Sequence, residues 1–198
     1  VNNNETYDIY IKNKIIHCRN IICCVPKFSL LNFTCISPIK ELLEKSVTCK
    51  PLCRVYAIFD ENDIWFENLK KKVVVNNQLR YIIPIDIKKG LIMISYTDDV
   101  YTKYWNKIKN NQAKLKNSIV KLVNKTFDIQ INEPRKVYVC YWDCGVAFWN
   151  KNMDSISISK KITNPIDNMF ICGENYSRNQ SWVEGALESC DRCLKLCT

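Results

Sequence analysis

The sequence predicts an α+β fold with a mixed, largely antiparallel sheet and covering helices. Between residues 54 and 96, short apolar runs of strand length alternate with turn-forming residues. Between residues 100 and 124, apolar residues recur at helical spacing. The 198 residues, 47% of them apolar, suffice for a full core, and no Gly/Ser-rich linker or repeat interrupts the chain.

The N-terminal part is expected to hold a hairpin, a buried strand and a helix. Residues Tyr7 to Ile16 alternate loosely between apolar and polar, with Asn13 at the turn. The apolar run Ile21 to Val25 predicts a buried strand, which Pro26 ends. Ser37-Pro38 is a helix-start signal. Apolar residues follow it at helical spacing: Ile39, Leu42, Leu43 and Val47.

A meander of strands and a long helix are expected next. The strand-like runs are Arg54 to Phe59, Lys72 to Val75, Leu79 to Ile83 and Gly90 to Tyr96. Thr97-Asp98-Asp99 is predicted to cap one amphipathic helix from about Val100 to Asn124. Pro134 then precedes a strand over Lys136 to Tyr141, and the last helix is expected over Trp182 to Cys197.

The C-terminal stretch predicts a cofactor-binding corner. An apolar strand from Met169 leads to Gly173-Glu174, a polar loop and then the helix that begins near Trp182. A helix N-terminus offers unpaired amides and the positive end of the helix dipole. Gly173 lets the backbone come close to a ligand, and Glu174 supplies an acceptor for a hydroxyl.

This corner resembles the C-terminal signature of the flavin-dependent amine oxidase family, which includes monoamine oxidases, polyamine oxidases and lysine-specific histone demethylases. The matching residues are Gly173-Glu174, Trp182-Val183-Glu184-Gly185-Ala186 and Ser189. Three further segments are similar to family segments and occur in the family's order: Asn20 to Pro26, Arg54 to Asp60 with Trp65, and Tyr141 to Trp149. Together they span nearly the whole chain. The resemblance therefore implies an amine oxidase substrate-domain-like fold followed by a flavin-contacting strand and helix.

The resemblance implies FAD as the cofactor and amine oxidation by hydride transfer to the flavin. Gly173 and Glu174 would contact the cofactor, with Glu174 reaching the ribityl or pyrophosphate region. The backbone amide of Val183 would face the flavin's N1 and O2 edge, and Trp182 would form an aromatic wall of the amine cage. Cys24 and Val25 match a corner that packs near the flavin. The cysteine that carries covalent flavin in monoamine oxidases aligns nearest Val146, so any flavin here is expected to be non-covalent.

Two residues match positions that lie next to the flavin or the substrate in the family. Arg54 occupies the position of a lysine beside the flavin, and arginine is larger and permanently charged. Trp142 and Gly145 match the segment that walls the substrate cavity, while Ala147 stands where an aromatic cage residue is common. Arg54 and Trp142 are the candidate catalytic residues. The identity of a small amine substrate does not follow from these residues.

The family's opening G-x-G-x-x-G turn has no counterpart in this chain. The glycines are Gly90, Gly145, Gly173 and Gly185, and no two are close enough to cradle a pyrophosphate. The chain is therefore expected to be the C-terminal half, with residues 1–165 as substrate-domain-like region and 166–198 as FAD-contacting region. Alone, it is expected to carry no flavin. The N-terminal half, supplied upstream or as another subunit, would complete the site; the alternative is a degenerate, cofactor-free binding or structural module.

The half-fold predicts an exposed contact surface. The side chains of Cys24, Val25, Trp182 and Val183 would line an open groove or a contact with another subunit, because a missing dinucleotide domain leaves its packing face uncovered.

Composition narrows the remaining function classes. Heavy use of Ile, Asn and Lys suggests an AT-rich genome such as that of a low-GC virus or a protist, and it raises the net charge to +9. The lysines are scattered and match no nucleic-acid-binding module, so a solvated basic surface is favoured and nucleic acid is not an expected partner. Apolar runs are strand-sized and no signal peptide pattern is present. The expected location is intracellular, in the cytoplasm, without membrane insertion.

The chain has twelve cysteines, which could be buried thiols, disulfide partners or metal ligands. Cys23, Cys24, Cys140 and Cys172 lie in apolar runs, where a free thiol acts as a small hydrophobe. Cys190, Cys193 and Cys197 share one helical face, but no second pair has matching spacing and His17 is the sole histidine. Reduced, mostly buried cysteines and no metal site are predicted; a secreted disulfide scaffold remains an alternative.

Overall fold

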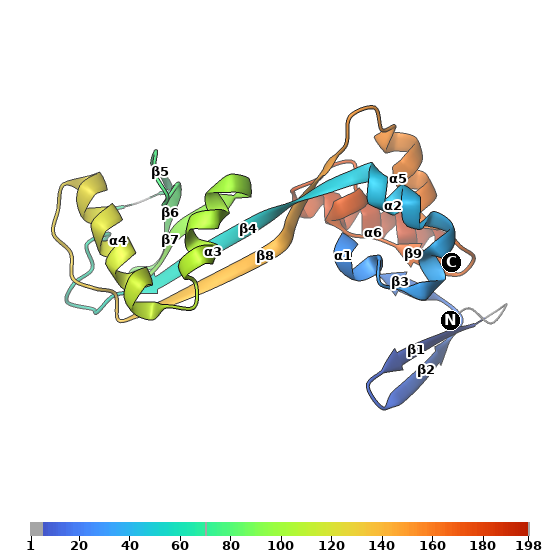
Figure 1. The fold of residues 1–198 in the computed structure, drawn as a ribbon, viewed down its shortest axis with the longest axis horizontal. Helices are drawn as coiled ribbons and strands as arrows, with labels where there is room; N and C mark the ends of the chain where they lie inside the picture. The colour runs from blue at the N-terminus through green and yellow to red at the C-terminus, as the bar shows by residue number, and fades with distance from the viewer. Residues whose placement is uncertain (1–5, 70, 198) are drawn as a thin grey trace. The chain divides into compact units, whose positions relative to one another are not determined.

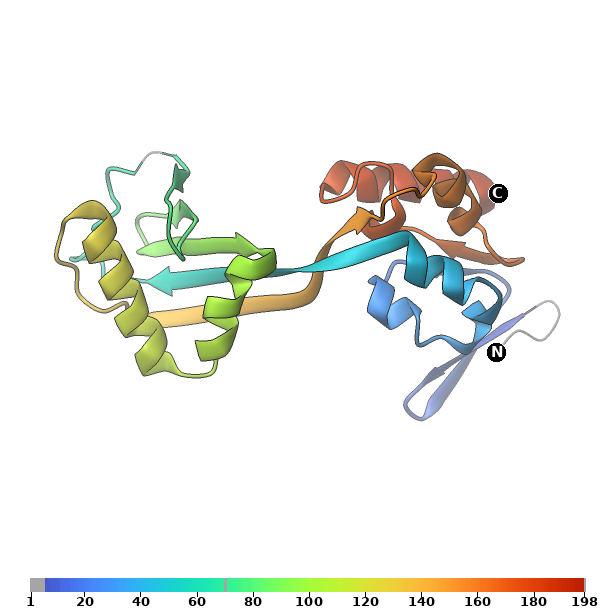
Figure 2. The same cartoon turned by 45° about the horizontal axis from the view of Figure 1, so that its top comes forward.

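The computed structural model describes residues 6–69 and 71–197. The chain divides into two compact units: unit 1 comprises Val1–Lys50 and Val146–Thr198, and unit 2 comprises Pro51–Gly145. Figures 1 and 2 show the elements of both units, coloured along the chain. The boundaries at residues 50/51 and 145/146 differ from the single boundary expected after residue 165.

Unit 1 opens with the expected hairpin. β1 (Tyr7–Ile11) pairs antiparallel with β2 (Lys14–Cys18), and the turn between them includes Asn13. Lys12 has a positive φ of 48°, as a tight turn requires. The alternating pattern therefore located this element correctly.

The strand expected from Ile21 to Val25 is shorter and less buried than predicted. β3 (Ile21–Cys23) pairs in parallel with β9 (Met169–Ile171) through three residue pairs. Only Cys23 is buried within β3; Ile22 is 44% exposed, and Cys24, beyond its end, is exposed. The short partner strand sets this limit, because β9 ends just before the turn at Gly173.

Helices complete unit 1. They are α1 (Lys27–Leu30), η1 (Thr34–Ile39), α2 (Lys40–Ser46), α5 (Ser155–Thr163), η3 (Glu174–Tyr176) and α6 (Val183–Cys197). The helix expected after Ser37-Pro38 therefore begins as a 3₁₀ segment, and its last apolar residue, Val47, already belongs to a strand. α5 was not predicted. Its cap is Asp154, whose side chain accepts hydrogen bonds from the amides of Ile156 and Ser157.

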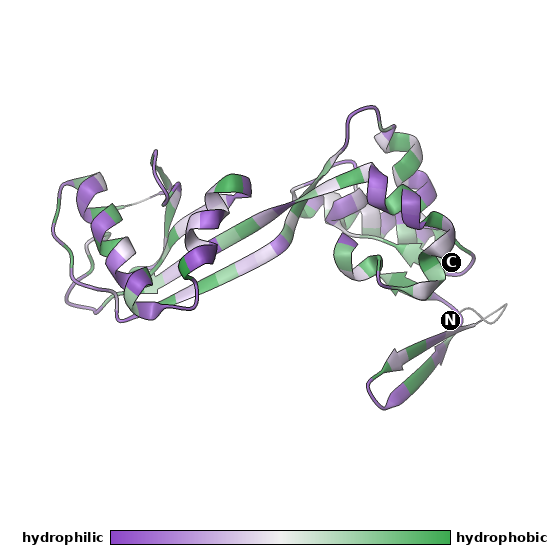
Figure 3. Ribbon diagram, viewed as in Figure 1, coloured by the Kyte–Doolittle hydropathy of each residue, from purple (hydrophilic) through white to green (hydrophobic). Residues whose placement is uncertain are grey.

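A buried cluster holds these elements together. It includes Tyr7, Leu30, Ile36, Leu43, Ile162, Met169 and Ile171. In Figure 3 the strands β3 and β9 are coloured largely as hydrophobic. β9 is buried at all three positions, as a strand inside a core should be.

Unit 2 is built on a five-stranded sheet with strand order β5-β6-β7-β4-β8. Its strands are β4 (Val47–Ile58), β5 (Val73–Val74), β6 (Tyr81–Asp86), β7 (Leu91–Asp98) and β8 (Lys136–Trp149). β4 pairs antiparallel with β7, β7 with β6, and β6 with β5. β4 and β8 are longer than predicted, and their residues 47–50 and 146–149 are counted in unit 1.

The long helix predicted from Val100 to Asn124 is in fact two helices. A 3₁₀ turn, η2 (Asp99–Tyr101), leads into α3 (Thr102–Ile108), and α4 (Gln112–Phe127) follows after a break. Asn111 caps the N-terminus of α4, because its side chain accepts a hydrogen bond from the amide of Lys114 at 3.0 Å. Thr97 and Asp98, expected in the cap, belong to β7.

The helices cover the sheet through a continuous apolar core. Its fully buried members include Val55, Ala57, Ile92, Ile94, Trp105, Leu115, Ile119 and Val123. α4 carries both apolar and polar segments in Figure 3, as expected for a helix with one buried face. The predicted fold class is confirmed. Among the described residues, no helix is both long and apolar enough to cross a bilayer.

Candidate functional site

The ends of β3 and β9 form the corner that the sequence singled out. The amide of Cys172 donates to the carbonyl of Cys23 at 3.1 Å, so the parallel ladder continues one step beyond the strands. The amide of Lys27 donates to Oδ1 of Asn175 at 2.7 Å. These bonds bring the segment around Cys24 and Val25 beside Gly173 and its neighbours.

Gly173 has a backbone that other residues adopt only with strain. Its φ is +128°, and a Cβ placed on it would meet no atom within 4 Å. Its amide donates to Oγ of Ser189 at 2.8 Å, which fastens the strand end to α6. The glycine is therefore required by its conformation, and the space in front of its backbone is open.

Glu174 organises the loop that follows. Its Oε1 accepts hydrogen bonds from the amide of Ala147 at 3.0 Å and from the amide of Ser181 at 2.6 Å. Its Oε2 accepts from Nδ2 of Asn175 at 2.7 Å. The carboxylate thus binds groups of unit 1 itself, a structural role that the sequence did not reveal.

The start of α6 is packed closely on one side and exposed on the other. A Cβ on Gly185 would collide with the carbonyl of Asn179 and the hydroxyl of Ser177, so the helix approaches this loop only because a glycine is present. Trp182 and Val183, in contrast, are 69% and 70% exposed. The first turn of α6 is therefore accessible.

Two hydroxyls in this loop lack partners. The Oγ atoms of Ser177 and Ser181 are buried and make no hydrogen bond with any described residue. Buried hydroxyls are normally paired, so these two atoms have unused hydrogen-bonding capacity. Because both oxygens are enclosed, they offer no surface to a ligand. The groups that this corner exposes are the backbone of Gly173 and the start of α6.

The two candidate catalytic residues lie in unit 2. Arg54, on β4, places its guanidinium 5.1 Å from the ring centre of Tyr96 and 6.0 Å from that of Trp142. Burial lowers the pKa of Arg54, but hydrogen bonds with Tyr96 and Tyr56 outweigh this and raise it above its ordinary value. Arg54 therefore remains a cation held against two aromatic faces.

Trp142 lies on β8 and is 44% exposed. A Cβ on the nearby Gly145 would collide with Leu52, so β8 passes β4 too closely for any larger residue. Gly145 therefore has a packing role. Ala147, also noted in this segment, is fully buried.

A pocket of about 370 Å³ lies next to Arg54, because the ring of Tyr96 that Arg54 contacts also lines the pocket. Its lining residues are Lys72, Tyr81, Ile83, Tyr96, Thr97 and Asp98. Nζ of Lys72 lies 4.9 Å from the ring centre of Tyr81, and Oγ1 of Thr97 is buried without a hydrogen-bond partner among the described residues. The sequence did not predict this pocket, because its lining comes from two strands and a loop.

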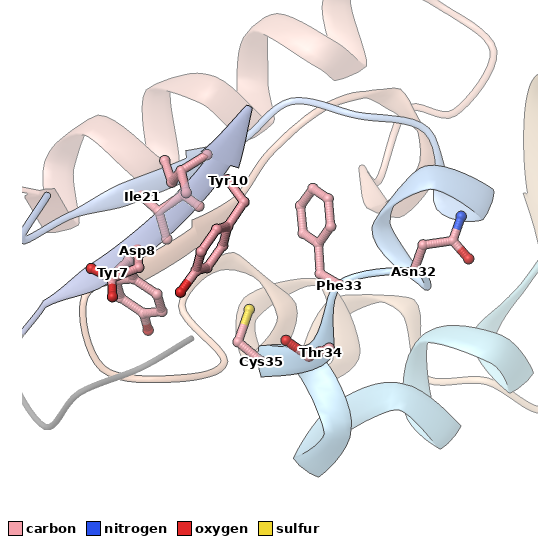
Figure 4. A pocket seen from close by; sticks show the side chains of 9 residues that line it. Tyr7, Asp8, Tyr10, Ile21, Asn32, Phe33, Thr34 and Cys35 are labelled. Carbon is pink, nitrogen blue, oxygen red and sulfur yellow. The ribbon is translucent and has the colours of Figure 1, made fainter. Parts of the chain in front are cut away.

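A second pocket, of about 310 Å³, lies in unit 1 (Figure 4). It is lined by Tyr7, Asp8, Ile9, Tyr10, Ile21, Asn32, Phe33, Thr34 and Cys35. Figure 4 shows the side chains of Tyr10, Phe33 and Cys35 around the cavity. None of the predicted site residues lines it. No local pattern could have revealed this pocket, because its lining comes from the hairpin, β3 and residues 32–35.

The cysteines are mostly free. Ten are free thiols, while Cys49 and Cys144 are disulfide-bonded. Burial raises the pKa of Cys23 to about 12 and that of Cys193 to about 11, which keeps both protonated. Cys193 is buried, and Cys190 and Cys197 are half-buried, on the shared face of α6. Within the described residues, no group of three or more His, Cys, Asp or Glu side chains could hold a metal ion.

Two solved structures share the fold. One is a protoporphyrinogen oxidase-like protein from Exiguobacterium sp. 255-15, with a TM-score of 0.67 and 12% identity, over 98% of this chain and 45% of that chain. The other is cyclohexylamine oxidase from Brevibacterium oxydans IH-35A, with a TM-score of 0.68 and 10% identity, over 98% of this chain and 47% of that chain. The chain thus spans less than half the length of either. No protein-family model matches the chain, and no curated protein matches it in sequence.

Proposed function

We propose that this chain is the substrate-domain part, with the C-terminal cofactor corner, of an FAD-dependent amine oxidase-like oxidoreductase. The main support is the corner itself: a parallel β3–β9 pair that leads through Gly173 into α6, in a fold shared with two oxidases over 98% of the chain. The missing glycine-rich turn would come from an N-terminal half or another subunit.

In this proposal the corner would hold a flavin non-covalently, and the chemistry that a flavin supplies is the acceptance of a hydride equivalent from the carbon next to an amine nitrogen. The open backbone at Gly173 would let the flavin's edge come close. The amide of Val183, in the first turn of α6, would stabilise negative charge at that edge, because the helix N-terminus is the positive end of the dipole.

Other residues would position these groups. Glu174 would fix the loop between Gly173 and α6 through its bonds to Ala147 and Ser181, instead of binding the ribityl chain as its sequence position suggested. The exposed ring of Trp182 would supply an apolar wall. Arg54 and Trp142 form a separate cluster within unit 2, in which the charge of Arg54 lies against the aromatic rings, and any catalytic role of theirs would rest on this cluster.

We propose that Cys24, Val25, Trp182 and Val183 contact the completing half. None of the four is buried: Val25 is half-buried and the other three are exposed. Exposed apolar side chains are typical of an interface where they form a contiguous patch, and the proposal requires these four to do so. On this basis the isolated chain should not retain FAD, because nothing in it binds the pyrophosphate.

The proposal is tested by adding riboflavin, which needs the corner but no pyrophosphate site. We expect saturable quenching of riboflavin fluorescence by the isolated chain, and no visible flavin absorbance in the protein as purified. Val183→Pro removes the critical amide while proline remains acceptable at the first helical position. It should weaken riboflavin binding about five- to tenfold, the value of one hydrogen bond.

Val183→Ala is the matched control, since it shortens the side chain and keeps the amide. It should bind riboflavin about as well as the wild type. Equal binding by the proline variant would refute the role of Val183. Absence of any riboflavin binding would instead support the alternative, a cofactor-free binding or structural module.

A further inference from the structure

Two cysteine side chains touch at the ends of β3 and β9. The Sγ atoms of Cys24 and Cys172 lie 3.2 Å apart. In the parallel ladder Cys23 faces Ile171, so Cys24 and Cys172 are the next pair, on the same side of the two strands. The amide of Cys172 bonds to the carbonyl of Cys23, which fixes this register.

This placement satisfies the geometric requirement of a disulfide. Neighbouring strands lie about 4.8 Å apart, and disulfide-bonded cysteines have Cα atoms about 4.4–6.8 Å apart. The two backbones therefore need little movement to close the bond.

The two thiols differ in access. Cys24 is exposed, whereas Cys172 is 7% exposed and packs with Phe170 and Cys193. Burial is the main cause that raises the pKa of Cys172 well above its ordinary range. Cys24 can therefore meet a reagent from solution, and Cys172 can react only with a group already beside it.

We propose that Cys24 and Cys172 form a redox modification site that exchanges with small-molecule disulfides. The thiolate of Cys24 attacks a disulfide RSSR, forming a mixed disulfide and releasing one RS⁻. The sulfur of Cys172 then attacks Sγ of Cys24, a second RS⁻ leaves, and the proton of Cys172 passes to that leaving group. The two cysteines are oxidised by two electrons, and RSSR is reduced to two thiols.

Neighbouring cysteines are poorer partners. Cys193 is fully buried, and its thiol donates to the carbonyl of Ile171 at 3.3 Å. Cys23 is 4% exposed and its high pKa, about 12, reflects that burial. Neither can be reached by a reagent in solution, so Cys24 starts the reaction.

Oxidation would join β3 to β9 at the residue before Gly173. This would cross-link the two strand ends from which the Gly173 turn begins, whether or not a flavin binds there. The inference needs no flavin at this turn. If the completing half covers Cys24 as proposed above, the reaction takes place in the chain without that half.

The test is disulfide mapping of the folded full chain in glutathione buffers of increasing oxidised fraction, followed by denaturation, alkylation and trypsin. Cleavage after Arg19 and Lys27 gives peptide 20–27, and cleavage after Lys161 and Arg178 gives peptide 162–178, in which Cys172 is the sole cysteine. We expect these two peptides linked, with a mass lower by two hydrogens than their sum, and a loss of two free thiols per chain.

Peptide 20–27 also holds Cys23, so variants assign the bond. Cys24→Ser should abolish the linked peptide and the loss of two thiols, while Cys23→Ser should retain both. Cys18→Ser is the control in the same unit, because Cys18 is half-buried and its thiol donates to the carbonyl of Tyr7. A link that persists in Cys24→Ser, a Cys172–Cys193 bond in place of this one, or a link formed equally well in denaturant would overturn the proposal.

Discussion

The carboxylate of Glu174 accepts a hydrogen bond from the backbone amide of Ala147, 27 positions away in the sequence, at 3.0 Å. The same oxygen accepts from the amide of Ser181. One side chain thus joins the end of β8, the turn after β9 and the loop before α6. Charge-assisted bonds of this kind are among the stronger ones in proteins.

Glu174→Gln should therefore destabilise unit 1. The substitution removes the negative charge and can turn an amide donor toward backbone amides. We expect a loss of about 1–3 kcal/mol in the free energy of unfolding, measured by urea denaturation. Glu184→Gln is the control, because Glu184 is exposed and its charge interacts only with the start of α6, and it should change stability by less than about 1 kcal/mol. Equal effects would contradict the organising role of Glu174.

The two glycines of the corner should respond differently to alanine. Gly185→Ala places a methyl group against the carbonyl of Asn179, which cannot move away without shifting the loop. The clash should cost about 2–3 kcal/mol in unfolding free energy, more than the roughly 1 kcal/mol that alanine adds in helix propensity. The expected result is a net loss in thermal or urea stability.

Gly173→Ala meets no atom, but it forces a non-glycine residue to a φ of +128°. Its cost should be backbone strain alone, about 1–3 kcal/mol. The side chains around it should keep their native packing, which near-ultraviolet circular dichroism would show. A loss of native packing in Gly173→Ala, or a stabilised Gly185→Ala, would contradict this assignment.

The buried thiol of Cys23 predicts a dependence of stability on pH. Burial raises its pKa from 9.0 to about 12 in the folded state. The unfolded chain therefore releases this proton first, and the stability from the neutral thiol is present below pH 9 and is lost as the pH rises toward 12. One group contributes a slope of at most about 1.4 kcal/mol per pH unit.

Cys23→Ala should remove that slope. We expect the difference in unfolding free energy between wild type and variant to shrink by about 1–2 kcal/mol between pH 9 and pH 10.5. Differences are used because lysines and tyrosines titrate in the same range. A difference that stays constant over this interval would show that Cys23 ionises equally in both states.

Arg54 and Trp142 should be energetically coupled. Their cation–π contact is partly exposed, so a double-mutant cycle of Arg54→Met and Trp142→Leu should give a coupling energy of about 0.5–1 kcal/mol. Arg54→Met with Tyr138→Leu is the comparison pair and should show additive effects, because the ring of Tyr138 contacts Lys136 and lies four residues along β8 from Trp142. Additivity in both pairs would mean that the contact contributes nothing to stability.

Local patterns predicted the elements, and long-range contacts set their limits. The alternation of Tyr7 to Ile16 was sufficient for the hairpin, because its pairing is local. The helix break at Asn111 was missed because apolar spacing continues across it, although the Asn cap was visible in the sequence. α5 was missed because its sequence is rich in serine and has few apolar residues. Only Ile158 and Ile162 of this helix pack in the cluster that contains β9.

The candidate site was predictable in part. The order strand, Gly-Glu, loop and helix was correct. Trp182 and Val183 are exposed, while the groove or subunit contact expected for them stays a prediction. The partners of Glu174 could not be foreseen, since they depend on where the end of β8 meets the loop. The contact between Cys24 and Cys172 likewise depends on a parallel pairing between strands almost 150 residues apart.

The interrupted sequence of unit 1 has a consequence for how the protein folds during synthesis. Unit 2 is one continuous segment, Pro51–Gly145, so all its contacts are available before the chain is finished. β3 must wait for β9, which is made much later. Because domains fold as units once their residues have emerged, unit 2 should acquire structure on the ribosome before β3 can pair with β9. The apolar strand β3 and its flanking cysteines would spend that interval without their partner.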